Sequence, residues 1–312
     1  MSSTQTIRER KMPKKELVFA DGIINKMIEY VNNNDKIPLN FKYESNVELD
    51  PERKLVWISN HSGWFAFDGF IGANSVFPEL KKNYMKVTGK KEGEFNQRDI
   101  LTAVVHEALK KPPISYFFPE KVLDEMLLDR REYTKMLKNK NFDSLPRNVA
   151  IFPEDERGST KSFLQAYKLK KFKTGFLRHA LATDSDIVIC TTVGNEELLP
   201  NLCSVKVEDN ETSSKFIFPI PLLPIINPIT LTLYNSPDYK FTTHEIVSIE
   251  SVRERIDNGE SIDDVAEFFR VKTQEYLDKE TFHRPVRVGS KFFDKFRKST
   301  ADLLDFKIEF KF

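Results

Sequence analysis

The sequence is poor in cysteine and contains no long apolar run. Its 312 residues include only two cysteines, Cys190 and Cys203, which excludes a disulfide framework and offers no metal-ligand spacing. This usage fits an intracellular protein. No stretch approaches the roughly 20 apolar residues of a membrane-spanning helix. The N-terminus is charged from Arg8 to Glu16 and lacks the apolar segment of a signal peptide. We therefore expect a cytoplasmic protein whose membrane contact is peripheral.

The chain also lacks an excess of charge of either sign. Its 48 basic residues nearly balance its 47 acidic ones, which argues against a dedicated nucleic-acid-binding protein, so no nucleic acid is expected as a partner. Hydrophobic residues make up 40% of the chain, enough for a substantial core. Among the aromatics, 26 phenylalanines stand against two tryptophans, and we expect most of these rings in the core.

The spacing of apolar residues predicts strands that alternate with helices. Short apolar runs indicate strands around 40–44, 55–58, 148–152 and 187–193. Helical spacing indicates helices over 16–32, 68–76, 100–111, 119–141, 174–183 and 262–277. This alternation is typical of an α/β fold, with a mostly parallel or mixed sheet flanked by helices. We expect a single domain over 16–280, between a flexible N-terminus at 1–15 and a basic aromatic tail at 281–312.

Local signals mark several element boundaries. Asp99 is expected to cap the 100–111 helix, and Ser261 with Asp264 forms a capping-box pattern before the helix at 262–277. Residues 216–234 are apolar but carry four prolines, so they form neither a continuous helix nor a central strand.

Two polar segments follow two of the expected strands. The first runs from Ser59 to Asp68, and the second runs from Ile151 to Ser159. Because ligands of open α/β sheets bind beyond the carboxyl ends of the strands, these segments are the candidate site.

The first segment contains a histidine and a carboxylate seven residues apart, His61 and Asp68. A carboxylate on one imidazole nitrogen fixes the tautomer and leaves the other nitrogen free as a base. The simpler interpretation makes Asp68 the N-cap of the following helix, and the two interpretations are compatible.

The second segment places Arg157 before small polar residues. Gly158 and Ser159 offer backbone amides and a hydroxyl that could join the guanidinium in holding a phosphate. From Gly158 to residue 183 there is no acidic residue, whereas lysines and arginines including Lys161 and Arg178 recur. This bias favours an anionic ligand or membrane surface, and a solvated basic face explains it nearly as well. For the acids at 155 and 156 we favour a solvated cluster.

Together these segments resemble the glycerophospholipid acyltransferases, the 1-acylglycerol-3-phosphate acyltransferase-like family. In that family a His…Asp block precedes a Phe-Pro-Glu-Gly-x-Arg block. The segment from Asn60 to Asp68 resembles a subgroup whose first block reads Asn-His-Ser-Gly-Gly-Leu-Pro-Phe-Asp. After the second block, four further segments also resemble this subgroup: residues 161–163, 167–169, 172–178 and 193–197. The likeness covers roughly residues 55–235.

The resemblance implies transfer of a fatty acyl group to a hydroxyl in an acyltransferase-type domain. The donor would be acyl-CoA or an acyl-carrier protein, the acceptor a lysophospholipid or glycerol phosphate, and no other cofactor or metal would take part. His61 would be the general base and Asp68 its orienting partner. Glu154 and Arg157 would shape the acceptor phosphate site. Gly158, Ser159, Lys161 and Arg178 complete the expected substrate contacts.

The sequence departs from the family pattern at two places that matter for function. Asp155 replaces the glycine that follows the glutamate, and no convincing arginine block lies between the two segments. A catalytically decayed lipid-binding protein therefore remains an alternative, as does an acyltransferase for a non-phosphorylated acceptor. Backbone amides near Gly63 are a guess for the oxyanion donors.

Attachment to an anionic membrane surface is a separate expectation. Residues 291–298 combine phenylalanines with lysines and an arginine, as interfacial anchors do, and the helix at 16–32 is the other candidate. Solvated termini explain both segments almost as well.

Overall fold

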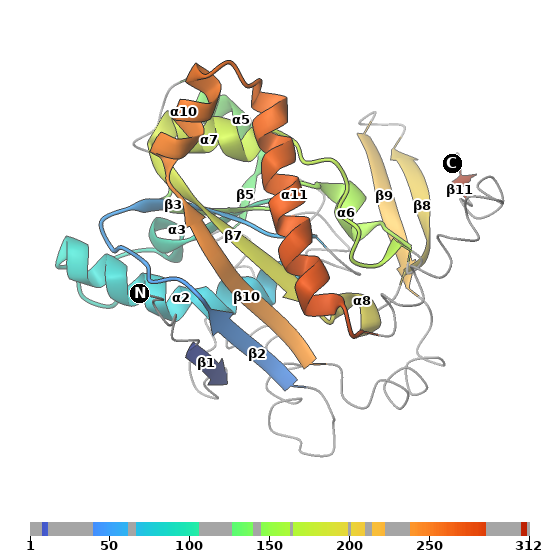
Figure 1. Ribbon diagram of the computed structural model, residues 1–312, viewed down its shortest axis with the longest axis horizontal. Helices are drawn as coiled ribbons and strands as arrows, with labels where there is room; N and C mark the ends of the chain where they lie inside the picture. Colours follow the sequence, from blue (N-terminus) through green and yellow to red (C-terminus); the bar gives the residue numbers. More distant parts are fainter. Residues whose placement is uncertain are drawn as a thin grey trace.

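The computed structural model describes residues 8–11, 40–61, 67–105, 127–139, 145–162, 165–198, 201–209, 214–221, 238–284 and 307–310. Its centre is an eight-stranded sheet in the order β1-β2-β10-β7-β3-β6-β4-β5 (Figure 1). The strands are β1 (Arg8–Lys11), β2 (Asn40–Ser45), β3 (Lys54–Ile58), β4 (Thr102–Val105), β5 (Leu127–Asp129), β6 (Asn148–Ile151), β7 (Ser185–Val193) and β10 (Asp238–Val247).

The sheet is mixed and mostly parallel. β3 pairs in parallel with both β6 and β7, and β4 pairs in parallel with β5 and β6, whereas β10 runs antiparallel to β7 and β1 antiparallel to β2. Parallel strands covered on both faces are apolar throughout, and the last four residues of β3 are all buried. The predicted α/β class and the four expected strands are thereby confirmed.

Helices pack on both faces of the sheet, which separates the two largest clusters of the core. On one face α2 (Phe67–Thr88) and α3 (Gln97–Ile100) pack against Trp57, Cys190 and Phe241. On the other face α7 (Gly175–Thr183), α10 (Ile249–Asp257) and α11 (Ile262–Thr281) cover Val56 and Ile58. In Figure 1 α11 lies across β7. Alternate residues of β3 thus enter opposite halves of the core.

The expected helix signals at 68–76, 174–183 and 262–277 are confirmed. The predicted capping box is present: the Ser261 hydroxyl accepts a hydrogen bond from the Asp264 amide, and the Asp264 carboxylate accepts one from the Ser261 amide. α11 continues four residues beyond the predicted end, to Thr281.

Two helix predictions were wrong in part. Residues 102–105 form the strand β4 instead of continuing a helix, because this β-branched segment pairs between β5 and β6. Asp99 therefore caps no long helix and lies inside the four-residue α3. Within the predicted helix at 119–141, residues 127–129 form β5, and the described helix is α5 (Arg130–Lys138).

A second sheet contains three strands in the order β11-β8-β9, namely β8 (Asn201–Asp209), β9 (Ser214–Pro221) and β11 (Lys307–Phe310). β9 carries two of the four prolines and is an edge strand, as the prolines require. The two short helices α6 (Glu156–Ser159) and α8 (Asn195–Leu198) complete the described elements. The helix expected at 16–32 and the anchor expected at 291–298 lie outside the described residues.

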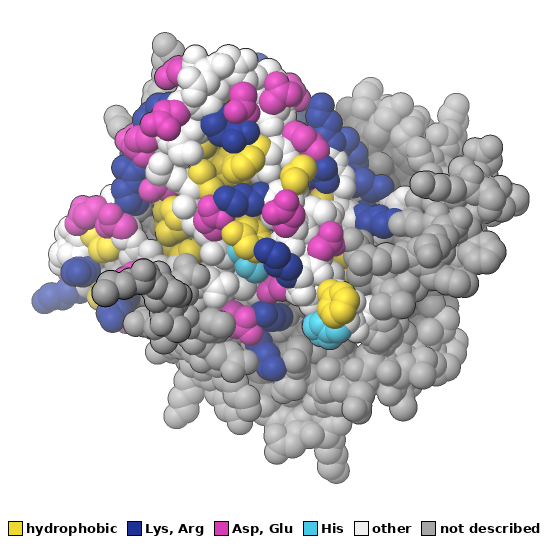
Figure 2. Space-filling view, in the orientation of Figure 1, with side chains coloured by type: hydrophobic (Ala, Val, Ile, Leu, Met, Phe, Trp, Pro, Cys, Tyr) yellow, Lys and Arg dark blue, Asp and Glu magenta, His cyan; other side chains and the backbone are white. Residues whose placement is uncertain are grey.

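The face formed by α10 and α11 carries charges of both signs, interspersed with small apolar areas (Figure 2). Among the described side chains, the large hydrophobic residues that are exposed are Val271 and Phe282. Within the described helices, none is long and apolar enough to span a membrane.

Candidate active site

The register of the sheet brings the two polar segments together. β3 and β6 are parallel neighbours, and Ile58 pairs with Ile151 at their carboxyl ends. His61 and Glu154 each lie three residues beyond these positions, so they meet at one edge of the sheet. The Glu154 carboxylate accepts a hydrogen bond of 3.1 Å from the His61 amide. The two polar segments therefore lie against each other at one edge of the sheet.

His61 and Asp68 form a hydrogen-bonded pair. Nδ1 of His61 lies 2.7 Å from Oδ2 of Asp68, which projects from the first turn of α2. Asp68 is fully buried, whereas the His61 side chain is 14% exposed. Because a carboxylate accepts and does not donate, Nδ1 carries the proton, and in the neutral ring Nε2 carries the lone pair. The other Asp68 oxygen accepts a hydrogen bond from the Gly69 amide. Because α2 begins at Phe67, Asp68 lies in its first turn and not at the N-cap position.

Three contacts hold the imidazole in place and set its charge. The ring stacks on Phe152 with the centroids 4.6 Å apart. Burial opposes protonation of the ring, but the carboxylates of Asp68 and Glu154 outweigh it, so the pKa of His61 is raised above its ordinary value. A histidine tuned in this way is a competent base once the solution pH exceeds that raised value.

The buried Glu154 carboxylate joins its own segment to His61, Lys161 and Lys170 by hydrogen bonds. Besides the His61 amide, its carboxylate accepts hydrogen bonds from the Lys170 amide at 2.7 Å and from the Lys161 ammonium at 3.2 Å. Both Glu154 and Lys161 are buried, with side chains 0% and 2% exposed. Glu154 thus fixes the backbone that presents His61.

Lys161 lies between two buried carboxylates. Its ammonium is 3.2 Å from Glu154 and 3.7 Å from Glu196, a residue of α8. Burial raises the pKa of Glu196 to about 7 despite the opposing effect of Lys161. The structure therefore places Lys161 inside the molecule, beneath the site.

Gly158 lies where the second segment crosses the first. A β-carbon at this position would be 2.9 Å from the Cβ of Glu154 and closer still to His61. Ser159, the next residue, uses its carbonyl to accept a hydrogen bond from the Asn201 amide group. The glycine therefore permits contact between the two segments, whereas Ser159 ties them to the start of β8.

The carboxylate of Asp155 is not the solvated group that the sequence indicated. It is 18% exposed and pairs with Arg130, at 2.9 Å, and with Lys173. Its backbone adopts the left-handed conformation, with a φ of 58°, which glycine prefers and aspartate tolerates. The resembled sequence block has glycine at this position, a residue that adopts this conformation readily. The side chain of Glu156 lies outside the described residues.

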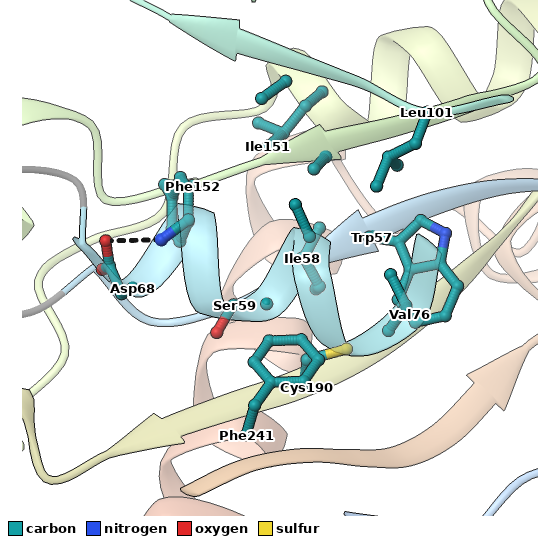
Figure 3. Close-up of a pocket in the computed structure, with 15 residues that line it drawn as sticks. Trp57, Ile58, Ser59, Asp68, Val76, Leu101, Ile151, Phe152, Cys190 and Phe241 are labelled. Carbon is teal, nitrogen blue, oxygen red and sulfur yellow. Dashed lines mark hydrogen bonds between the residues drawn. The ribbon is translucent and has the colours of Figure 1, made fainter. Parts of the chain in front are cut away.

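Beside the pair formed by His61 and Asp68 lies a narrow apolar pocket of about 40 Å³ between α2 and the sheet. In Figure 3 Asp68 and Phe152 lie at one end, and Trp57 and Val76 at the other. The remaining lining residues are mainly apolar and include Ile58, Leu101, Ile151, Cys190 and Phe241.

Glycines on α2 permit two aromatic rings that line this pocket to pack closely against the helix. A β-carbon on Gly69 would lie 3.2 Å from the Phe152 ring, and one on Gly72 would lie 2.7 Å from the Phe241 ring. The sequence analysis missed these glycines and Phe152. The spacing of glycines at positions i and i+3 of an apolar helix is the signal that could have found them, because it places both on one helix face.

A larger groove of about 560 Å³ lies on the other face of the sheet, between α5 and the start of α7. Arg157 and Arg178, two of the residues expected to contact substrate, both line it. Phe152 connects the groove to the pair formed by His61 and Asp68, because it lines both the groove and the apolar pocket and stacks on His61. Gly63 lies outside the described residues. Within the described part of the chain, no group of three or more His, Cys, Asp or Glu side chains is arranged to hold a metal ion.

Comparison with known proteins gives partial matches, and no protein-family model matches the chain. An uncharacterized protein of Mycobacterium leprae is 37% identical over 84 residues, and one of Mycobacterium tuberculosis is 39% identical over 85. These matches cover 27% of this chain, and the chain spans only 23–24% of the length of these relatives.

One solved structure is also similar. It is the 1-acyl-sn-glycerophosphate acyltransferase of Thermotoga maritima, with a TM-score of 0.42 and 13% sequence identity. The match covers 74% of this chain and 67% of that chain. A likeness at this level assigns no function.

Proposed function

We propose that the protein is an O-acyltransferase that moves a fatty acyl group from a thioester to the hydroxyl of a phosphate-bearing lipid acceptor. The observation that carries the proposal is the hydrogen bond of 2.7 Å between His61 Nδ1 and the buried Asp68 carboxylate, which leaves Nε2 available as a base. The order of the sequence blocks around these residues, which resembles the glycerophospholipid acyltransferases, supports the same assignment.

The reaction needs only proton transfer and positioning, because a thioester is already activated. Nε2 of His61 takes the proton of the acceptor hydroxyl as its oxygen attacks the thioester carbonyl carbon. The carbon–sulfur bond then breaks, and the departing thiolate receives the proton from the imidazolium. Asp68 holds the ring in one tautomer and stabilises its positive charge during transfer.

The apolar pocket is the proposed site for the start of the acyl chain. Its wall contains Asp68 and Phe152, which both contact the His61 ring, so a chain entering it would bring its carbonyl to the base. At about 40 Å³ the pocket holds only a short segment, so longer chains require α2 to move away from the sheet.

The groove on the other face is the proposed site for the acceptor phosphate. Arg157 is exposed and lines it, and its guanidinium donates to the Lys171 carbonyl at 3.2 Å. No described carboxylate pairs with Arg157 or Arg178, so both guanidinium groups can bind an anion there. In this proposal Glu154, Gly158 and Lys161 position the segment, and Ser159 anchors its end.

The activity can be tested by thiol release from palmitoyl-CoA, with and without a lysophospholipid, together with mass spectrometry of the lipid product. Acceptor-dependent release with formation of the diacyl product supports the proposal. Binding to liposomes without release from acyl-CoA or acyl-carrier protein would favour the lipid-binding alternative. Product formed with sterol or diacylglycerol alone would indicate a non-phosphorylated acceptor.

Peripheral attachment to an anionic membrane is proposed on the C-terminal sequence alone. Removal of residues 290–312 should reduce co-sedimentation with vesicles that contain phosphatidylglycerol. Unchanged sedimentation would show that this segment is not the anchor.

A further inference from the structure

The groove between α5 and α7 contains its own counter-charge. Five cationic side chains line it, namely Arg130, Arg157, Lys171, Lys173 and Arg178, against two carboxylates, Asp155 and Asp263. Asp263 pairs with Lys171 at 3.2 Å, and both of these side chains are mostly exposed. Asp155 is more enclosed, at 18% exposure, and it pairs with two cations at once.

The position of Asp155 is fixed by its backbone and by both partners. It follows Glu154 directly, in a left-handed turn whose amide donates to the Phe152 carbonyl at 3.0 Å. From there its carboxylate reaches Arg130 of α5 and Lys173, which precedes α7. Cationic side chains bind carboxylates and phosphates alike, and here a carboxylate of the chain itself pairs with both cations.

We propose that Asp155 is an intramolecular counter-anion that sets the charge preference of the groove. It neutralises part of the field of Arg130 and Lys173 and repels an incoming phosphate. Because this repulsion grows with ligand charge, Asp155 weakens the binding of doubly charged phosphate monoesters more than that of singly charged phosphodiesters. The inference rests on the proposed function in that it concerns the acceptor: Asp155 shifts the preference of the groove toward lysophospholipids with an esterified headgroup.

The charge dependence gives a quantitative expectation. The cations are about half exposed, so water screens the repulsion strongly. At water-like screening over about 6 Å, one carboxylate weakens binding about threefold for each negative charge on the ligand. Removal of its charge should therefore tighten a monoanion about threefold and a dianion about tenfold.

The test is calorimetric binding at pH 8 with Asp155→Asn, since asparagine tolerates the left-handed backbone equally well. The probes are glycerol 3-phosphate as the dianion and glycerophosphoglycerol as the monoanion. Adenosine 3′,5′-bisphosphate represents the phosphates of a coenzyme A donor. Asp184→Asn is the matched control, because Asp184 also has a left-handed backbone, with a φ of 56°, and pairs with one arginine outside the groove.

Tightening of glycerol 3-phosphate by about tenfold, with about threefold for the diester and less than twofold in the control, supports the inference. If Asp155→Asn tightens only the adenosine probe, Asp155 still acts as a counter-anion, and the groove is assigned to the coenzyme A donor. Unchanged or weaker binding of all three probes overturns the inference, as does an equal gain in Asp184→Asn. Binding is measured without turnover, so these results stand whether or not acyl transfer is found.

Discussion

Gly158 is in direct contact with His61: a β-carbon on the glycine would lie 2.7 Å from the Cβ of His61 and 2.9 Å from its carbonyl oxygen. The glycine of the second polar segment therefore packs against the proposed base of the first. Its own amide donates to the Asp155 carbonyl in the turn that follows β6. The two segments form one structural unit, held by Glu154 on one side and Gly158 on the other.

We predict that Gly158→Ala displaces His61. The added methyl group must push the histidine or its backbone away, with a loss of about 1–3 kcal/mol in the free energy of unfolding. Acyl transfer should fall at least tenfold, roughly as expected for a misplaced catalytic group. Gly259→Ala is the control, because it strains a left-handed turn (φ of 94°) between α10 and α11 and should lower stability without a loss of turnover. Full activity in Gly158→Ala would contradict the packing.

Lys161→Met should destabilise the fold strongly. The substitution leaves Glu154 and Glu196 buried without their cation, and removal of one partner of a buried ion pair costs about 3–5 kcal/mol. Urea unfolding monitored by circular dichroism measures this loss. Lys171→Met, which removes the exposed partner of Asp263, should change stability by less than about 0.5 kcal/mol. Similar losses in both variants would show that Lys161 is not buried as described.

Glu196 should make stability depend on pH. Because its pKa is raised to about 7 in the folded protein, the folded state holds a proton that the unfolded state releases at lower pH. Stability therefore falls as the pH rises from the ordinary carboxyl range to about 7. Glu196→Gln removes this dependence, so its stability relative to the parent protein should increase by up to about 3 kcal/mol between pH 5 and pH 8. A pH-independent difference in urea unfolding would refute the assignment.

The rate of acyl transfer should fall as the pH is lowered through the raised pKa of His61, because the protonated ring cannot act as a base. Asp68→Asn removes the strongest influence that raises this pKa, so the acidic limb of the pH–rate profile should move to lower pH. The maximal rate should also fall about a hundredfold or more, since the tautomer is no longer fixed. A lower rate with an unshifted acidic limb would show that Asp68 does not raise the pKa of His61.

Much of the site could be predicted because parallel strands align their carboxyl ends. Once 55–58 and 148–152 were identified as strands, His61 and Glu154 were expected at one edge, and the register of β3 and β6 places them there. The capping box at Ser261 was equally local and equally predictable. Such features depend on neighbours in sequence or on a general property of the sheet.

Other features depend on contacts between residues far apart in the chain, which a single sequence does not predict. Residues 102–105 have helical spacing in isolation, and only pairing with β5 and β6 makes them a strand. The basic run around Lys161 indicates a surface cation. In the fold, however, Lys161 pairs with Glu196 of α8, which lies 35 residues later in the chain. The sequence indicates a solvated Asp155, because it does not show that Arg130 of α5 pairs with this carboxylate in the fold.

The central claim is that His61 is the base of an acyl transfer, and one comparison tests it most directly. Thiol release from palmitoyl-CoA, with a lysophospholipid acceptor, is measured for the parent protein, for His61→Ala and for His283→Ala. His283 is an exposed histidine that follows α11, so its variant controls for loss of an imidazole as such. We predict acceptor-dependent release that His61→Ala reduces at least a hundredfold and His283→Ala leaves intact. Equal release by all three proteins would contradict the assignment of His61.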